Sequence, residues 1–214
     1  MKKIVYTIIL LSLLQVQCLG QSSISIAGAA RWGSESIPLF IDNYGNKVTL
    51  STGSGISAGG EYSYDFSWLF NLTSDVMIHY SNLSQKGENA NGHFIGMEMH
   101  ITPSLTFPAR EYPKFKVLLG AGAGLYTFNT IKVFAKGAGG ESMTFKYKPA
   151  LGPHIQILFR IKAVNDSYLT IGMRYYIISY TFTDKGSTHY STLKEISNPN
   201  GSGIGLFISI GEYL

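Results

Sequence analysis

The chain has little cysteine, little charge and no long apolar run after its first residues. Its 214 residues include one cysteine, Cys18, and 14% of them are charged. One thiol cannot form disulfide bridges within the chain or a cysteine-based zinc site. After the apolar residues 4–14, no segment approaches the roughly 20 apolar residues that a membrane-spanning helix needs. These absences exclude a disulfide scaffold and a bundle of membrane helices.

The composition also gives no sign of nucleic-acid, metal or cofactor binding. The formal net charge of +4 includes Lys2 and Lys3, and the other basic residues are scattered. The glycines of residues 120–124 lack the spacing of a nucleotide-binding loop. No short metal-ligand spacing joins the five histidines, which are His79, His93, His100, His154 and His189. We therefore expect no cofactor, no metal and no nucleic-acid partner.

The first residues have the pattern of a secretory signal peptide. A basic start is followed by the apolar residues 4–14, and small residues, Cys18 and Gly20, precede the expected cleavage point. We expect residues 1–20 to be removed as a signal peptide. Residues 21–214 are then long enough for one domain.

Instead of a helical pattern, the chain shows large apolar residues that alternate with small or polar ones. In residues 203–214, large apolar side chains fall on one face and glycine or serine on the other. A period of two is typical of a strand. The pattern recurs, over about the length that a tilted strand needs to cross a bilayer, in seven earlier segments, which are residues 23–32, 55–66, 73–82, 92–105, 115–128, 149–162 and 168–182.

The connections between these segments alternate in length. Long connections are expected at residues 33–54, 83–91, 129–148 and 183–201, and short turns at residues 67–72, 106–114 and 163–167. Long outer loops and short periplasmic turns are typical of outer-membrane barrels. We therefore predict an all-β protein, an eight-stranded antiparallel up-and-down transmembrane β-barrel with both termini in the periplasm.

Aromatic side chains are expected to form two girdles at the boundaries between lipid and water. The group at the short-turn end consists of Phe66, Trp68, Phe70, Phe107, Tyr112 and Phe115. The group near the long loops consists of Trp32, Tyr126, Phe128, Tyr180 and Phe182.

Over essentially residues 21–214, this pattern resembles small eight-stranded outer-membrane barrels of the OmpA, OmpX and OmpW kind, including the "outer membrane protein beta-barrel domain" family. The resemblance implies a monomer in the outer membrane of a Gram-negative bacterium. Its implied partners are outer-membrane lipid, lipopolysaccharide and the insertion machinery. Such barrels commonly end in an aromatic residue that this machinery reads, whereas here the aromatic residue, Tyr213, is penultimate.

The inward face carries both acids and bases. An eight-stranded barrel is just wide enough for its own side chains to fill, and buried charges persist only when they are paired. We therefore expect a plugged polar lumen in a non-enzymatic barrel; a small porin-like channel is an alternative. The predicted lumen network consists of Glu61, Asp65, Asp75, His79, Glu98, His100, Lys116, His154, Arg160, Lys162 and Arg174.

The outer loops are then expected to carry out surface interaction or envelope stabilisation. Few acids accompany their lysines, so attraction to the anionic headgroups of lipopolysaccharide is a hypothesis. These lysines are Lys47, Lys132, Lys136, Lys146, Lys148, Lys185 and Lys194.

One short motif suggests a second alternative, an ester hydrolase. The sequence His79-Tyr-Ser81-Asn82 resembles the His-x-Ser-Asn signature of PagL-type lipid A deacylases, which are also outer-membrane barrels. The resemblance implies that His79 is the general base and Ser81 the nucleophile. Two features depart from that family. The motif lies on the third predicted strand rather than near the end of the barrel, and the first carboxylate after the following Asn89-Ala-Asn91-Gly92 segment is Glu98.

Overall fold

The computed structural model describes residues 20–41, 47–82, 90–108, 114–135, 142–183 and 198–214. In chain order the strands are β1 (Gln21–Gly33), β2 (Ile37–Ile41), β3 (Lys47–Leu50), β4 (Gly55–Asp65), β5 (Phe70–Asn82), β6 (Ala90–Phe107), β7 (Phe115–Ala135), β8 (Ser142–Lys146), β9 (Ala150–Lys162), β10 (Ser167–Tyr176) and β11 (Gly203–Tyr213). In the part of the chain so described, no helix is long and apolar enough to cross a membrane. Nearly all of the predicted signal peptide lies outside the described residues, so it stays a prediction.

The strands close into a barrel. Nine of them form one sheet in the order β6-β5-β4-β1-β11-β10-β9-β7-β8, and β6 also pairs with β7. This pairing closes eight strands into a ring and leaves β8 outside it. Every pairing in the ring is antiparallel, and the first strand pairs with the last, with Ser23 opposite Tyr213. The predicted eight-stranded up-and-down barrel is therefore confirmed.

The two faces of the wall differ as the alternation predicts. In β11, Ile204, Leu206 and Ile208 are exposed, whereas Phe207 and Ser209 are buried. The same holds around the ring, and Ile26 on β1 is 79% exposed. Contiguous apolar surface on this scale is rare on water-soluble monomers. An outer face of this kind matches the apolar band of a transmembrane barrel.

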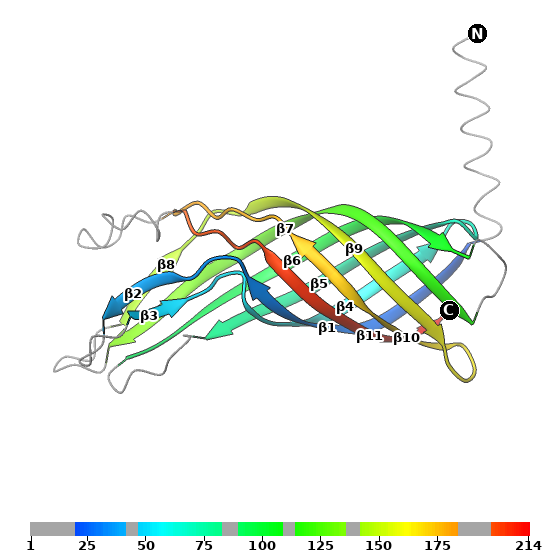
Figure 1. The fold of residues 1–214 in the computed structure, drawn as a ribbon, viewed down its shortest axis with the longest axis horizontal. Coiled ribbons are helices and arrows are strands. Elements are labelled where there is room, and N and C mark those ends of the chain that lie inside the picture. Colours follow the sequence, from blue (N-terminus) through cyan, green and yellow to red (C-terminus); the bar gives the residue numbers. More distant parts are fainter. Residues whose placement is uncertain (1–19, 42–46, 83–89, 109–113, 136–141, 184–197) are drawn as a thin grey trace, which may run out of the picture.

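The strands β2, β3 and β8, which lie within two of the expected long connections, are at one end of the barrel, and the C-terminus is at the other (Figure 1). Two of the segments expected to be loops contain further strands. Within residues 33–54, β2 and β3 form a hairpin, and within residues 129–148, β7 continues to Ala135 and pairs with β8. Ile131, Val133 and Phe145 are buried there. Their alternation was hidden in the sequence by the lysines and glycines around them.

The seventh predicted strand is shorter than expected. The sequence pattern predicts a strand over residues 168–182, but β10 ends at Tyr176. Ile177 donates its N–H to the carbonyl of Pro153 (3.0 Å), and proline has no N–H to return the bond. The regular ladder therefore stops, and beyond it isolated bridges join Tyr147 to Phe182 and Ser179 to Asn200.

Two of the expected girdle residues lie inside the barrel instead. Tyr126 and Tyr180 are buried, because they continue the inward alternation of their segments. In contrast, Trp32 and Phe128 are exposed at the long-loop end, and Phe128 has a φ of 55° at a bulge in β7. At the other end the exposed aromatics are Phe66, Trp68, Phe70, Phe107 and Phe115. Tyr112 lies outside the described residues.

Candidate functional site

Inside the barrel, acidic and basic side chains lie on different strands and face each other. The buried acids lie on three adjacent strands, with Glu61 and Asp65 on β4, Asp75 on β5 and Glu98 on β6. The bases that face them come from β1, β7, β9 and β10, and they are Arg31, Lys116, Arg160 and Arg174. Three acidic strands thus face bases on four of the five remaining strands of the ring.

Two of the ion pairs join opposite walls. Arg174 Nη2 lies 2.8 Å from Asp75 Oδ2, and both side chains are fully buried. Arg160 Nη2 lies 3.5 Å from Glu61 Oε1. In each pair the two strands are four places apart in the ring of eight. Each pair therefore crosses the full width of the lumen.

Two further pairs cross the lumen between strands three places apart. Arg31 pairs with Glu98, both buried, and Lys116 Nζ lies 2.9 Å from Asp65 Oδ2. All four buried acids are thereby paired, as burial of charge requires.

The set of bases differs from the prediction at two positions. Arg31 is not in the predicted network, although the alternation of β1 turns it to the same face as Ser25. Lys162 is in that network but lies at the rim, because it is the last residue of β9. Its side chain is 31% exposed and pairs with Asp166 of the following turn (3.3 Å).

Hydrogen bonds tie the central pair into the lumen. The Asp75 carboxylate accepts from Arg174 and also from His100, whose Nδ1 lies 2.6 Å away. Arg174 Nε donates to Gln156 Oε1 (2.9 Å). Thr102 Oγ1 on β6 lies 2.7 Å from His154 Nε2 on β9. A carboxylate held by several donors is strongly stabilised in its charged form.

Aromatic and apolar side chains fill the space around the charges. The Arg31 guanidinium lies 4.1 Å from the Tyr176 ring centroid, and the Arg160 guanidinium 4.3 Å from that of Tyr168. Such stacking favours a desolvated cation. A second buried group inside the ring is apolar and consists of Ala27, Ala29, Met77, Leu118, Leu158 and Phe207.

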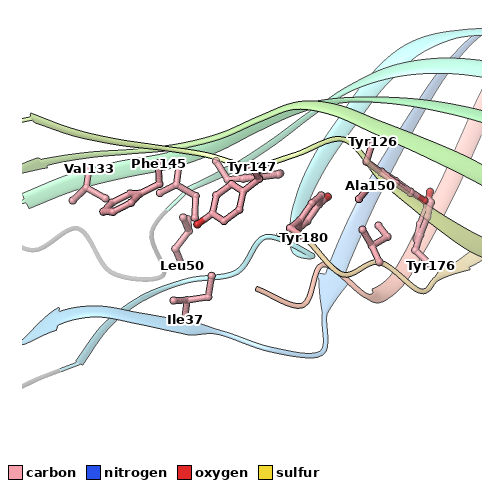
Figure 2. Packing of buried hydrophobic residues seen from close by; sticks show 12 residues of the cluster. Ile37, Leu50, Tyr126, Val133, Phe145, Tyr147, Ala150, Tyr176 and Tyr180 are labelled. Atoms are coloured by element: carbon pink, nitrogen blue, oxygen red, sulfur yellow. The ribbon is translucent and has the colours of Figure 1, made fainter. Parts of the chain in front are cut away.

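A larger apolar group, the outer apolar cluster, lies at the long-loop end. Figure 2 shows it running from Tyr126 and Tyr176 in the barrel wall to Ile37, Leu50 and Val133 in the outer extension, which is formed by β2, β3, β8 and the end of β7. Its buried members are Ile37, Leu50, Phe94, Tyr126, Ile131, Val133, Phe145, Tyr147, Ala150, Tyr176, Ile178 and Tyr180. The β2–β3 hairpin, β7 and β8 therefore pack together over the mouth of the barrel.

The His-x-Ser-Asn motif is not arranged as a base and its nucleophile. His79 Nδ1 lies 3.0 Å from Ser57 Oγ, whereas Ser81 Oγ donates to the carbonyl of Ser51 (2.8 Å). Both motif side chains are buried in the lumen, away from the lipid face. Asn82 accepts from the Tyr80 hydroxyl (2.8 Å) on the outer side. The contacts present do not join these residues into a hydrolytic site.

Among the described residues, no group of three His, Cys, Asp or Glu side chains is placed to hold a metal ion. His189 lies outside the described residues.

The chain was compared with protein families, curated proteins and solved structures. No protein-family model matches the chain, and no curated protein matches it. The outer membrane protein OprG from Pseudomonas aeruginosa is similar in structure, with a TM-score of 0.55, 12% identity, and coverage of 91% of this chain and 96% of that chain. Neisserial surface protein A has a TM-score of 0.51, 14% identity, and coverage of 90% and 96%. The chain therefore has the fold of small outer-membrane β-barrel proteins.

Proposed function

We propose that this protein is a closed, non-enzymatic barrel of the outer membrane of a Gram-negative bacterium, and that its work is done at the outer surface. The single observation that carries this proposal is the set of four ion pairs across the lumen. A diffusion pore needs a continuous column of water. Here the side chains of opposite walls meet each other instead.

The outer apolar cluster supports the same function. We expect it to narrow the mouth, because its side chains, such as Leu50, Ile131 and Tyr180, are largely inaccessible to solvent. Apolar constrictions resist wetting and so oppose ion flow. An ion would have to pass both this cluster and the charged layers below it.

We infer the orientation in the membrane from the ends of the barrel. The ends of β1 and β11 meet beside the short turns, and a signal peptide would deliver the N-terminus to the periplasm. The extension made by β2, β3 and β8 would then face outward. Surface interaction or envelope stabilisation is the role that we assign to it.

Planar-bilayer recording tests the closed lumen. We expect the reconstituted protein to show no stable open state of large conductance, because charged and apolar side chains fill its interior. A long-lived open state of the unmodified protein would contradict the proposal and favour the porin-like alternative.

A matched variant shows whether the ion pairs form the seal. Arg31→Ala combined with Glu98→Ala removes the pair beside the outer apolar cluster without leaving a lone buried charge. We expect brief openings in this variant under the same voltage. Lys114→Ala, at the exposed short-turn end, is the control and should stay closed.

A further inference from the structure

Three lysines project from one side of the outer extension. Lys132 on β7, Lys146 on β8 and Lys148 just after β8 are all exposed. Their neighbours Ile131, Phe145 and Tyr147 turn inward into the outer apolar cluster. The alternation therefore fixes the three lysines on the outer face of this hairpin.

The strand register brings these lysines close together. Lys132 lies opposite Thr144, and Thr130 lies opposite Lys146. Lys132 and Lys146 are thus diagonal neighbours, with Cα atoms about 7–8 Å apart. Lys148 follows Lys146 by two residues, a step of about 7 Å along an extended chain. Three like charges at this spacing repel one another unless an anion lies among them.

The height of the group above the apolar band matches the level of lipid headgroups. Phe128 is 76% exposed at the bulge, and Leu151 is 78% exposed on the adjoining strand. A tilted strand rises about 2.5 Å per residue along the barrel axis. Lys132 therefore lies about 10 Å beyond Phe128, and Lys148 lies three residues beyond Leu151.

Aromatic rings extend the same face toward β6. His93 lies opposite Lys132 in the ladder. The His93 ring stacks on Tyr80, with centroids 5.6 Å apart, and also lies near Phe134, at 6.2 Å. Rings beside cations are typical of the boundary between lipid and headgroups.

Among the residues that the structure describes, no acid lies on this face. Within β6, β7 and β8 the single carboxylate is Glu98, and it points into the lumen, where it pairs with Arg31. Glu35 is exposed in the connection between β1 and β2. Since β1 and β7 are four places apart in the ring, Glu35 belongs to the opposite side. The positive field on the β7–β8 side is thus uncompensated by these strands.

We propose that Lys132, Lys146 and Lys148 form a binding site for the phosphate groups of an outer-leaflet lipid, whose acyl chains lie along Phe128 and Leu151. The inference rests on the proposed function, because it needs the extension to face the outer leaflet. Several amines converge on one headgroup, and each adds attraction that salt weakens. The site would fix this side of the barrel against the leaflet.

Native mass spectrometry of retained lipid tests the site. The protein is placed in phosphatidylcholine nanodiscs with bis-phosphorylated lipid A as the probe, and the lipid A carried into detergent is counted. We expect the triple variant Lys132→Gln/Lys146→Gln/Lys148→Gln to retain at least about tenfold less lipid A, since each lysine near an anionic surface contributes several-fold and the three factors multiply. Lys146→Gln alone should reduce retention, whereas the matched Lys114→Gln, at the other end of the barrel, should not.

Two further arms identify the source of the phosphate. Dephosphorylated lipid A, with the same acyl chains, should not be retained by the unmodified protein. Excess inorganic phosphate should not displace bound lipid A. Unchanged retention in the triple variant overturns the site, as does equal retention of dephosphorylated lipid A or displacement by inorganic phosphate. Conductance of the same samples separates the two proposals, because an open pore with lysine-dependent retention would overturn the closed lumen alone.

Discussion

Replacing Arg174 with methionine is expected to lower the free energy of unfolding by about 3–5 kcal/mol, the usual cost of leaving a buried charge without its partner. Arg174 and Asp75 are both fully buried, and their contact crosses the lumen. In the variant, the Asp75 carboxylate keeps His100 as a donor but loses its cation. Urea unfolding of the protein in lipid vesicles, followed by tryptophan fluorescence, measures the change.

A double variant separates the lone charge from the loss of packing. Asp75→Leu combined with Arg174→Met removes both charges and keeps most of the volume, so we expect it to recover most of the stability. If the single variant were as stable as the unmodified protein, the ion pair across the lumen would not exist in the membrane. If the double variant were no better than Arg174→Met, the loss would come from packing rather than from an unpaired carboxylate.

Placing a cation on the outer wall is expected to be almost as costly. Ile208 lies at the middle of β11 with its side chain exposed on the outer face. An arginine at the midplane of a lipid-facing wall costs about 2–4 kcal/mol, and the cost falls toward the interfaces. We therefore expect Ile208→Arg to destabilise the protein by that amount in the same unfolding measurement.

Val164→Arg is the matched control for this prediction. Val164 is 79% exposed, but it lies in the short turn after β9 rather than on the wall. In water the two substitutions would cost about the same, a few tenths of a kcal/mol, because both sites are exposed surface. A small and equal effect at the two positions would therefore contradict a hydrocarbon environment around β11.

The wall of the barrel could be predicted because the alternation is local. Adjacent residues of a strand, such as Phe207 and Ile208, point to opposite faces, whatever the rest of the chain does. The same rule placed Asp75 and Arg174 inside. The same rule places Arg31 and Tyr126 on inward positions of their strands. The prediction did not use it there, because it left Arg31 out of the lumen network and assigned Tyr126 to a girdle.

The pairing inside the lumen could not be predicted in the same way. Which base meets Glu98 depends on how far each strand is shifted against its neighbour and on how the ring closes. These quantities sum over many strand pairs, and a shift of two residues in one pair keeps every side chain on its face while changing its partner. The contact of Arg31 on β1 with Glu98 on β6, three places away in the ring, is of this kind.

The extension was missed for a different reason. Residues 33–54 and 129–148 are rich in polar residues and glycine, so their apolar positions did not stand out from a loop composition. Ile37 and Leu50 lie opposite each other in the β2–β3 hairpin, and they are buried in the outer apolar cluster, whose other members come from other segments of the chain. A core assembled from short segments leaves little periodic signal in any one of them.

The central claim is that alternate side chains of a closed ring touch hydrocarbon while their neighbours are enclosed. The most direct test is a single-cysteine scan with nitroxide labels through Gly203–Tyr213, in a protein whose sequence after Cys18 contains no other thiol. Accessibility to oxygen, which concentrates in lipid, should be high at Ile204, Leu206, Ile208 and Ile210. It should be low at the positions between them. A uniform accessibility to water-soluble relaxation agents along the strand would contradict the account.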